Sequence, residues 1–180
     1  MSLDVDAPPL DTERLTLRGH RLEDFADSAA MWGDPEVTRF IGGRPATREE
    51  TWARLLRYAG HWRLLGFGYW VVRERESGRF VGEVGYADFH RAIDPPFDGT
   101  PEAGWALSPW AQGRGFATEA VGALVAWGDM RFQRARTVCM INPENGPSIA
   151  VARRCGFSPY AETRYHEAPT VLFERNGPGA

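Results

Sequence analysis

The sequence predicts a single-domain protein of mixed α/β class, and three observations support this. The chain has 180 residues, about the length of one domain, and 43% of them are hydrophobic, enough for a sizeable core. Residues 68–89 show the pattern of a β-hairpin. Over residues 102–132, a short apolar stretch, a glycine-rich turn and a long apolar segment follow one another. This order predicts a strand, a turn and a mostly buried helix.

The chain is expected to begin with a flexible leader, residues 1–10, which contains two adjacent prolines. Residues 12–18 alternate polar and apolar side chains, which predicts a strand. Residues 21–32 carry apolar side chains near helical spacing, and Gly33 follows as a stop signal. The folded domain is therefore expected to start at about residue 11 with a strand followed by a helix.

A turn-rich connector, residues 34–43, precedes the second predicted helix. That helix opens at Thr47, because Thr47 and Glu50 have the spacing of a capping box, and it runs to about Leu65. Two strands then form the hairpin, joined by a turn at residues 76–79 that contains serine and glycine. The first half of the chain thus predicts two helices followed by an antiparallel pair.

The second half of the chain opens with a long loop, residues 90–101, which contains three prolines and a glycine. Residues 102–107 form the strand before the glycine-rich turn. Residues 135–141 form a second strand after the long apolar helix, because they are rich in β-branched side chains.

The last elements are a short helix and two closing strands. Asn145 is a suitable N-cap for the helix, and Gly156 stands where a C-terminal glycine is expected. Residues 157–165 and 169–175 predict the strands, and residues 176–180 form a tail. The predicted domain spans residues 11–175, with no internal repeat and no linker long enough to divide it.

Composition excludes several functional classes. The net charge of −3 and the isoelectric point near 5.8 argue against a general nucleic-acid binder. No apolar run is long enough for a membrane span, and the acidic N-terminus lacks the pattern of a signal peptide. The two cysteines, Cys139 and Cys155, do not make a disulfide framework, and no metal-ligand spacing is present. We therefore expect a cytoplasmic protein without a metal.

The glycine-rich turn is the main functional signal. Gly113 and Gly115 alternate with Gln112 and Arg114 before the predicted helix, so backbone N–H groups face outward at the positive end of its dipole. A phosphate or pyrophosphate is the natural ligand. A P-loop is disfavoured because no lysine is present, and a dinucleotide fingerprint is disfavoured because Thr118 replaces its third glycine. An ordinary glycine-rich turn is the non-functional alternative.

The motif of residues 112–117 also matches, at every fixed position, the acyl-CoA loop Arg/Gln-x-x-Gly-x-Gly/Ala of the GNAT N-acetyltransferase superfamily. The chain resembles that superfamily over roughly residues 11–175, and its element order agrees. Residues 12–18 and 102–107, the stretch from Trp110 to Ala120, and the Asn145-Gly-Pro-Ser148 to Gly156-Phe157 region resemble the ribosomal-protein N-terminal acetyltransferase branch. Several motifs in the right order make a chance match much less probable than a single one does.

The resemblance implies a GNAT fold, with a mostly antiparallel sheet of about six to seven strands and about four helices. It implies that the strands at 102–107 and 135–141 splay apart through a bulge in the first. It also implies that acetyl-CoA is the cosubstrate and that an amine attacks the thioester directly. The residues it assigns to CoA are Leu107, Gln112, Gly113, Arg114, Gly115, Phe116, Ala117, Thr118, Asn145 and Ser148.

The catalytic residues are less clearly matched. Ala152 stands where the superfamily often has a general-acid tyrosine. Ser148 matches the serine proposed as proton donor to sulfur in the ribosomal-protein branch; its alternative role is to satisfy local helix backbone. Glu102 is the best-placed base on the strand before the turn, acting through water, and Asp94 and Asp98 are its rivals.

The expected acceptor is an amine, either a protein N-terminal α-amine or a small molecule. The connector at residues 33–46 and the loop at 90–101 are its expected walls. A CoA-binding sensor or interaction module without turnover is the alternative function, favoured by Ala152. No nucleic acid or membrane is expected as a partner. The sequence leaves open whether the protein is a homodimer, and also the acyl length and the acceptor's identity.

Overall fold

The computed structural model describes residues 7–133 and 135–177. These residues form eight strands in one sheet, β1 (Leu10–Asp11), β2 (Leu15–Arg18), β3 (Tyr69–Glu74), β4 (Phe80–Ala87), β5 (Glu102–Leu107), β6 (Thr137–Ile141), β7 (Ser158–Tyr165) and β8 (Ala168–Arg175). Their α helices are α1 (Phe25–Trp32), α2 (Pro35–Thr38), α3 (Arg48–Leu65), α4 (Phe116–Arg131) and α5 (Gly146–Arg154). Two short 3₁₀ helices are η1 (Leu22–Asp24) and η2 (Pro109–Ala111).

The strands lie in the order β1-β2-β3-β4-β5-β6-β8-β7, and every neighbouring pair is antiparallel except β5 and β6. The parallel pair is joined at one register position only, Glu102 to Val138, and diverges beyond it. From residue 103 onward, that edge of β5 therefore has no strand partner. The predicted splay is confirmed and lies at the middle of the sheet.

The bulge expected in the strand at residues 102–107 is not present. The β4–β5 register runs without a shift from Gly82 opposite Leu107 to Ala87 opposite Glu102. Among the described strands, register shifts occur instead in the β3–β4 and β7–β8 pairs. The two central strands thus separate without an extra residue in β5.

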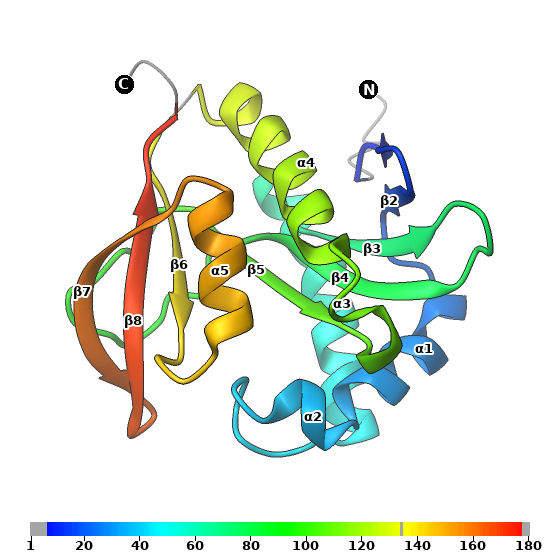
Figure 1. Ribbon diagram of the computed structural model, residues 1–180, viewed down its shortest axis with the longest axis horizontal. Helices are drawn as coiled ribbons and strands as arrows, with labels where there is room; N and C mark the ends of the chain where they lie inside the picture. The colour runs from blue at the N-terminus through cyan, green and yellow to red at the C-terminus, as the bar shows by residue number, and fades with distance from the viewer. Residues whose placement is uncertain (1–6, 134, 178–180) are drawn as a thin grey trace.

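Helices cover both faces of the sheet: α4 and α5 lie in front of it in Figure 1, and α3 lies behind. Alternation along β3 explains this arrangement, because successive side chains point to opposite faces. Trp70 and Val72 pack in the main core with α4, whereas Val71 packs in a separate cluster with α1 and α2. Both faces of the central strands are consequently buried, and β4 is buried along its whole length.

The helix signals in the sequence are confirmed. Thr47 caps α3, because its hydroxyl oxygen accepts a hydrogen bond from the backbone N–H of Glu50. The Glu50 carboxylate in turn accepts from the backbone N–H of Thr47, which completes the capping box. Gly66 ends that helix with a φ of 70°, in the left-handed region that favours glycine. The connector also contains the short helix α2, capped by Asp34. The sequence predicted about four helices; with α2, the described residues contain five α helices.

The N-terminal region is more ordered than predicted. Ala7 belongs to the main core, and the Pro8 carbonyl accepts a hydrogen bond of 2.8 Å from Trp70 Nε1. Residues 10–11 then pair with β2, which adds a strand to the expected set. The packed domain therefore begins before residue 11. The remaining leader residues, 1–6, and the tail residues 178–180 lie outside the described part of the chain.

Within residues 7–133 and 135–177, no helix combines the length and the apolar character needed to cross a bilayer.

Candidate active site

The glycine-rich turn between β5 and α4 leaves a row of backbone amides free. Gly113 and Gly115 have φ angles of 71° and 80°, a region that L residues with a side chain rarely adopt. Gly115 is the N-cap of α4, so no side chain caps that helix. No described residue accepts a hydrogen bond from the N–H groups of residues 113–118. These amides form an anion-binding surface at the positive end of the α4 dipole.

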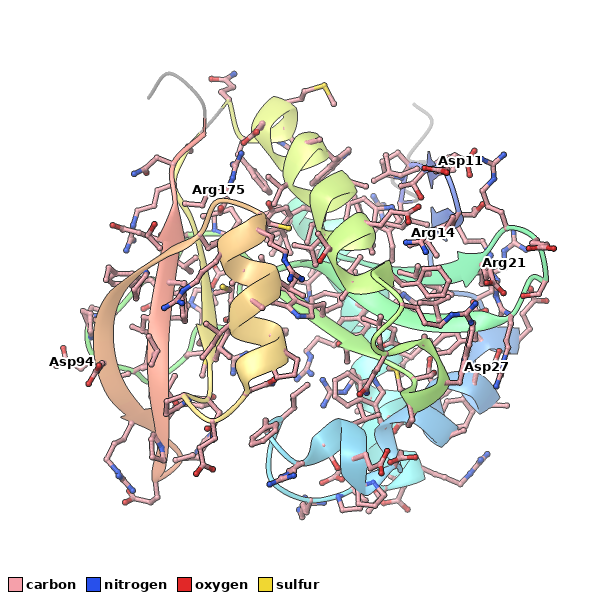
Figure 2. The ribbon with its side chains drawn as sticks, viewed as in Figure 1. Asp11, Arg14, Arg21, Asp27, Asp94 and Arg175 are labelled. Atoms are coloured by element: carbon pink, nitrogen blue, oxygen red, sulfur yellow. The ribbon has the colours of Figure 1, made fainter. Side chains whose placement is uncertain are left out.

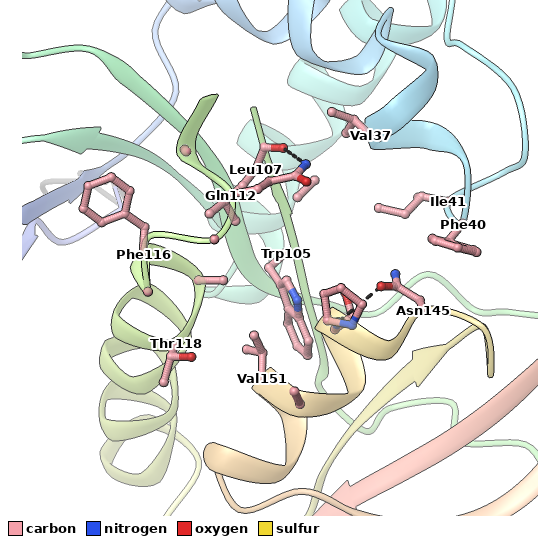
Figure 3. A pocket seen from close by; sticks show the side chains of 18 of the residues that line it. Val37, Phe40, Ile41, Trp105, Leu107, Gln112, Phe116, Thr118, Asn145 and Val151 are labelled. Carbon is pink, nitrogen blue, oxygen red and sulfur yellow. Dashed lines mark hydrogen bonds between the residues drawn. The ribbon is translucent and has the colours of Figure 1, made fainter. Parts of the chain in front are cut away.

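A cavity of about 350 Å³ extends from this turn between β5 and α5 (Figure 3). It is called the turn cavity below. Trp105 and Val151 form part of its wall. Most residues that the sequence assigned to CoA line it: Leu107, Gln112, Gly113, Gly115, Phe116, Ala117, Thr118, Asn145 and Ser148. The fold therefore brings together residues from β5, the turn, α4 and α5.

Arg114 is the exception in the predicted CoA set, because it does not line the turn cavity. Its guanidinium lies 5.3 Å from the ring centroid of Trp110 and 5.0 Å from that of Phe116. Trp110 is itself fixed by a hydrogen bond of 2.9 Å from its Nε1 to the Phe80 carbonyl, outside the cavity lining. The Gln112 side chain ties the turn to β5 by donating to the Leu107 carbonyl over 3.1 Å.

The N-terminus of α5 presents Ser148 to the cavity. Asn145 Oδ1 accepts from the Ser148 backbone N–H over 3.2 Å, which confirms the predicted N-cap. The Ser148 hydroxyl makes no hydrogen bond to any described residue, so it is not occupied by local helix backbone. Ala152, one turn further on, is fully buried and offers no proton donor. Ser148 is therefore the hydroxyl that α5 directs to this site.

A larger cavity, of about 700 Å³, lies next to the turn cavity. It is called the acceptor cavity below. Residues 39–43 of the connector line it, as expected, whereas His90 and Arg91 are the only lining residues from the loop at 90–101. The two cavities share five lining residues, Phe40, Ile41, Trp105, Asn145 and Ser148. They consequently meet at the unpaired edge of β5.

Glu102 lines the acceptor cavity, but its carboxylate is fully engaged. Arg91 donates to it twice, from Nε over 2.6 Å and from a terminal nitrogen over 2.9 Å. Burial acts to lower the pKa of Arg91, but the Glu102 carboxylate overcomes this and raises it above the usual value. Because both oxygens of Glu102 already accept from a fixed cation, this geometry does not support its predicted role as the base.

The two rival carboxylates lie outside the site. Asp94 is exposed at the outer edge of the molecule, beside β7 (Figure 2). Asp98 is also exposed, and neither side chain lines the turn cavity or the acceptor cavity. The predicted loop carboxylates therefore remain far from the junction of the two cavities.

Sequence patterns did not reveal Tyr69. Its side chain crosses from β3 over Gly85 of β4, and its hydroxyl occupies the space that a Cβ at Gly104 of β5 would fill. Tyr58 of α3 stacks on it with ring centroids 4.2 Å apart. Burial, the neighbouring Tyr58 and the charge of Glu102 raise its pKa well above the ordinary value. The pairing of two glycines on adjacent strands was the available signal, but only the register shows that they face Tyr69.

One group of potential metal ligands occurs among the described residues, at Asp88, His90 and Asp98. The ligand atoms lie within 4.8 Å of one another. Asp88 already accepts from the backbone N–H groups of His90 and Gly99. These hydrogen bonds explain the cluster as part of the loop's own structure, and two of its three members are exposed.

Known proteins with similar sequences or structures indicate the family of this chain. An "uncharacterized N-acetyltransferase p20" from Bacillus licheniformis is 31% identical over 159 residues, covering 88% of this chain and 86% of that protein. The solved structure of a putative GNAT-family acetyltransferase from Bordetella pertussis is 34% identical, with a TM-score of 0.83 and coverage of 94% and 99%.

The ribosomal-protein branch is represented at lower similarity. A ribosomal L7/L12 α-N-protein acetyltransferase, solved in complex with coenzyme A, has a TM-score of 0.77 and coverage of 96% and 100%. Its identity to this chain is 16%, so the likeness shows the fold alone.

The family model described as the acetyltransferase (GNAT) domain matches residues 14–158, from β1–β2 to the start of β7. That span contains the free amides of the turn, the splayed pair of strands, the whole lining of the turn cavity and most of the lining of the acceptor cavity. The protein belongs to the GNAT family of acetyltransferases.

Proposed function

We propose that this protein transfers an acetyl group from acetyl-CoA to an amine by direct attack on the thioester. The observation that carries the proposal is the meeting of the two cavities at Trp105, Asn145 and Ser148. The free amides of the turn suit the pyrophosphate of CoA, and the unpaired edge of β5 suits the pantetheine arm. An amine in the acceptor cavity then reaches the thioester from the other side.

In this reaction the amine nitrogen bonds to the carbonyl carbon and the carbon–sulfur bond breaks. The nitrogen loses a proton, and the leaving thiolate gains one. We assign the Ser148 hydroxyl as the hydrogen-bond donor to the sulfur. Tyr69, which lines the acceptor cavity, is a second donor, since its raised pKa keeps the phenol protonated.

Cys139 lines the acceptor cavity but does not offer a covalent route. Burial raises the pKa of its thiol well above the ordinary value, so the nucleophilic thiolate is disfavoured. This supports direct attack. With Glu102 held by Arg91, the ammonium proton of the acceptor leaves to water in the open cavity. An α-amine, with a pKa of about 7.7–8.0, needs less help than a lysine at about 10.4.

The acceptor is therefore a protein N-terminal α-amine, as the ribosomal-protein branch suggests, or a small amine of similar pKa. One observation supports the alternative function, a CoA-binding sensor: a buried alanine, Ala152, stands in place of a tyrosine. Release of free CoA thiol on addition of amines separates the two, because a sensor binds acetyl-CoA without turnover.

The test of the CoA site is Ala117→Asp, in the first turn of α4. An acidic residue there favours the helix dipole, so the variant is expected to fold. At a separation of about 6 Å and an effective dielectric constant of about 20, its repulsion of one phosphate charge is about 3 kcal/mol, or ~100-fold in Kd.

Calorimetric titration with acetyl-CoA measures the effect. Ala126→Asp, an exposed position on the same helix outside the cavity, is the matched control and is expected to bind like wild type. Equal affinity of the folded Ala117→Asp variant and the wild type would refute the assignment of the turn.

A further inference from the structure

Four arginines line the acceptor cavity. Arg91 is paired with Glu102, which leaves Arg39 from the connector and Arg54 and Arg57 from α3. Arg54 lies 3.8 Å from the ring centroid of Trp32, and Arg57 lies 4.9 Å from that of Phe89. Stacking uses the flat faces of a guanidinium and leaves its edge N–H groups available as donors. The aromatic rings therefore hold two cations in place without consuming their hydrogen-bonding capacity.

Arg54 is held most firmly and is incompletely satisfied. Its Nε is buried without a hydrogen-bond partner among the described residues, and one terminal nitrogen donates to the Tyr58 hydroxyl over a long 3.4 Å. Trp32, its stacking platform, is fixed by a hydrogen bond of 2.8 Å to Glu83. A buried donor without an acceptor is costly, so Arg54 is incompletely satisfied within the protein. Because this Nε is enclosed, an anion in the cavity would be bound by the terminal N–H groups of Arg54.

The carboxylates near this cavity are already committed to other groups. Glu102 accepts twice from Arg91, and Asp88 accepts from two backbone N–H groups. Glu83, behind Trp32, accepts from Ser28 and Trp32 and lies 3.2 Å from His20. Within the described part of the chain, neither Arg54 nor Arg57 forms a salt bridge with any of them.

The cations also repel one another. Burial, followed by the nearby charges of Arg54 and Arg91, lowers the pKa of Arg57 below its ordinary value, against the opposing effect of the tyrosines. For Arg54, burial acts to lower the pKa, but Tyr58 and the charge of Glu83 outweigh it and raise the pKa, although Glu83 forms no salt bridge with Arg54. A cavity with more cations than uncommitted carboxylates raises the affinity for anions and disfavours polycations.

We infer that the acceptor is an amine that also carries an anionic group, a carboxylate or a phosphate, and that Arg54 and Arg57 bind this group. The inference rests on the proposed acetyltransferase function and narrows its acceptor class. A guanidinium fork matches the planar pair of carboxylate oxygens or two phosphate oxygens. Polyamines and other polycationic amines are correspondingly poor acceptors.

The test compares matched amines that differ in the anionic group alone. L-methionine is paired with L-methioninamide, and O-phosphoethanolamine with ethanolamine; spermidine represents polycations. Each is titrated against the enzyme–CoA complex, where no transfer occurs, and is then assayed for turnover with acetyl-CoA. The anionic member of at least one pair is expected to bind at least about tenfold tighter than its partner, as for one charged hydrogen bond. Which pair responds distinguishes a carboxylate from a phosphate.

Arg54→Met keeps an unbranched apolar stem but removes the guanidinium and its charge, and it should abolish that preference while leaving CoA affinity unchanged. Arg63→Met, an exposed arginine of the same helix outside the cavity, is the matched control and should retain the preference. If Arg54→Met unfolds, Arg57→Gln provides the same test at an exposed position.

The outcomes separate the two proposals. Anionic amines that bind the CoA complex without turnover would contradict catalysis but support this inference. Equal or tighter binding by the amides, ethanolamine or spermidine would overturn the inference while leaving the acetyltransferase proposal intact. Failure of every anionic amine to bind a CoA-competent protein would also overturn it.

Discussion

The position of the Tyr69 hydroxyl can be tested by filling the space that Gly104 leaves for it. In Gly104→Ala, the new Cβ would coincide with the Tyr69 hydroxyl. The ring cannot turn away freely, because Tyr58 stacks on one face with planes 6° apart and Gly85 lies beneath its base. The hydroxyl must therefore move from its present position beside Gly104.

Two effects of known size follow. Overpacking a well-filled core costs about 1–3 kcal/mol, and replacing a strand glycine by alanine returns about 0.5–1 kcal/mol. The net loss of about 1–2 kcal/mol corresponds to a fall in Tm of roughly 2–8 °C for a domain of this size. A catalytic group displaced by about 1 Å costs ~100-fold in rate. Acetyl-CoA affinity should not change, because Tyr69 does not line the turn cavity.

Three measurements check this: thermal unfolding, calorimetric titration with acetyl-CoA, and turnover with the best amine found for wild type. Gly122→Ala is the matched control, since a Cβ at this exposed helical glycine meets nothing within 4 Å. A Gly104→Ala variant with wild-type turnover would show that the Tyr69 hydroxyl has no part in the reaction. A Tm equal to wild type would contradict the steric argument itself.

Two further predictions concern catalysis and pH. Ser148→Ala should lower turnover by at least about tenfold with acetyl-CoA affinity unchanged, since general-acid assistance is typically worth about 10²–10⁴-fold; a smaller loss would leave Ser148 a structural role. Asp24 is buried between Arg18 and Arg73; burial acts to raise its pKa, but these hydrogen bonds lower it from 3.8 to about 2. Its folded pKa is depressed, so its contribution is complete above about pH 4 and is lost as the pH falls toward 2. Asp24→Asn should thus cost about 2 kcal/mol at pH 7 in urea unfolding, with the difference from wild type shrinking below pH 4. A gap that does not depend on pH would contradict this linkage.

The sequence alone determined the elements whose signals are local. The capping box at Thr47 and the N-cap at Asn145 each depend on residues a few positions apart, and both are confirmed. The acyl-CoA loop could be identified for the same reason, since free amides at a helix start follow from the glycines themselves. One local signal was incomplete: the proline pair at the N-terminus suggested a leader, but Ala7 packs in the core.

Only the tertiary structure decided the partners of the candidate catalytic groups. Glu102 looked like a free base along the chain, but Arg91, eleven residues away, occupies both of its oxygens. Tyr69 lies opposite Gly85 in the β3–β4 pair, and Gly85 lies opposite Gly104 in the β4–β5 pair. The contact between Tyr69 and Gly104 follows from these two pairings and from no spacing in the sequence.

The charge of the acceptor cavity is also a property of the fold. Along the loop at residues 90–101, two aspartates stand against one arginine, so the local count of charges is negative. In the structure those aspartates lie outside the cavity, while Arg54 and Arg57 of α3 face into it. The electrostatic potential of the cavity depends on distances in space. The packing of α3 against β3 sets those distances, and they cannot be read from the order of residues along the chain.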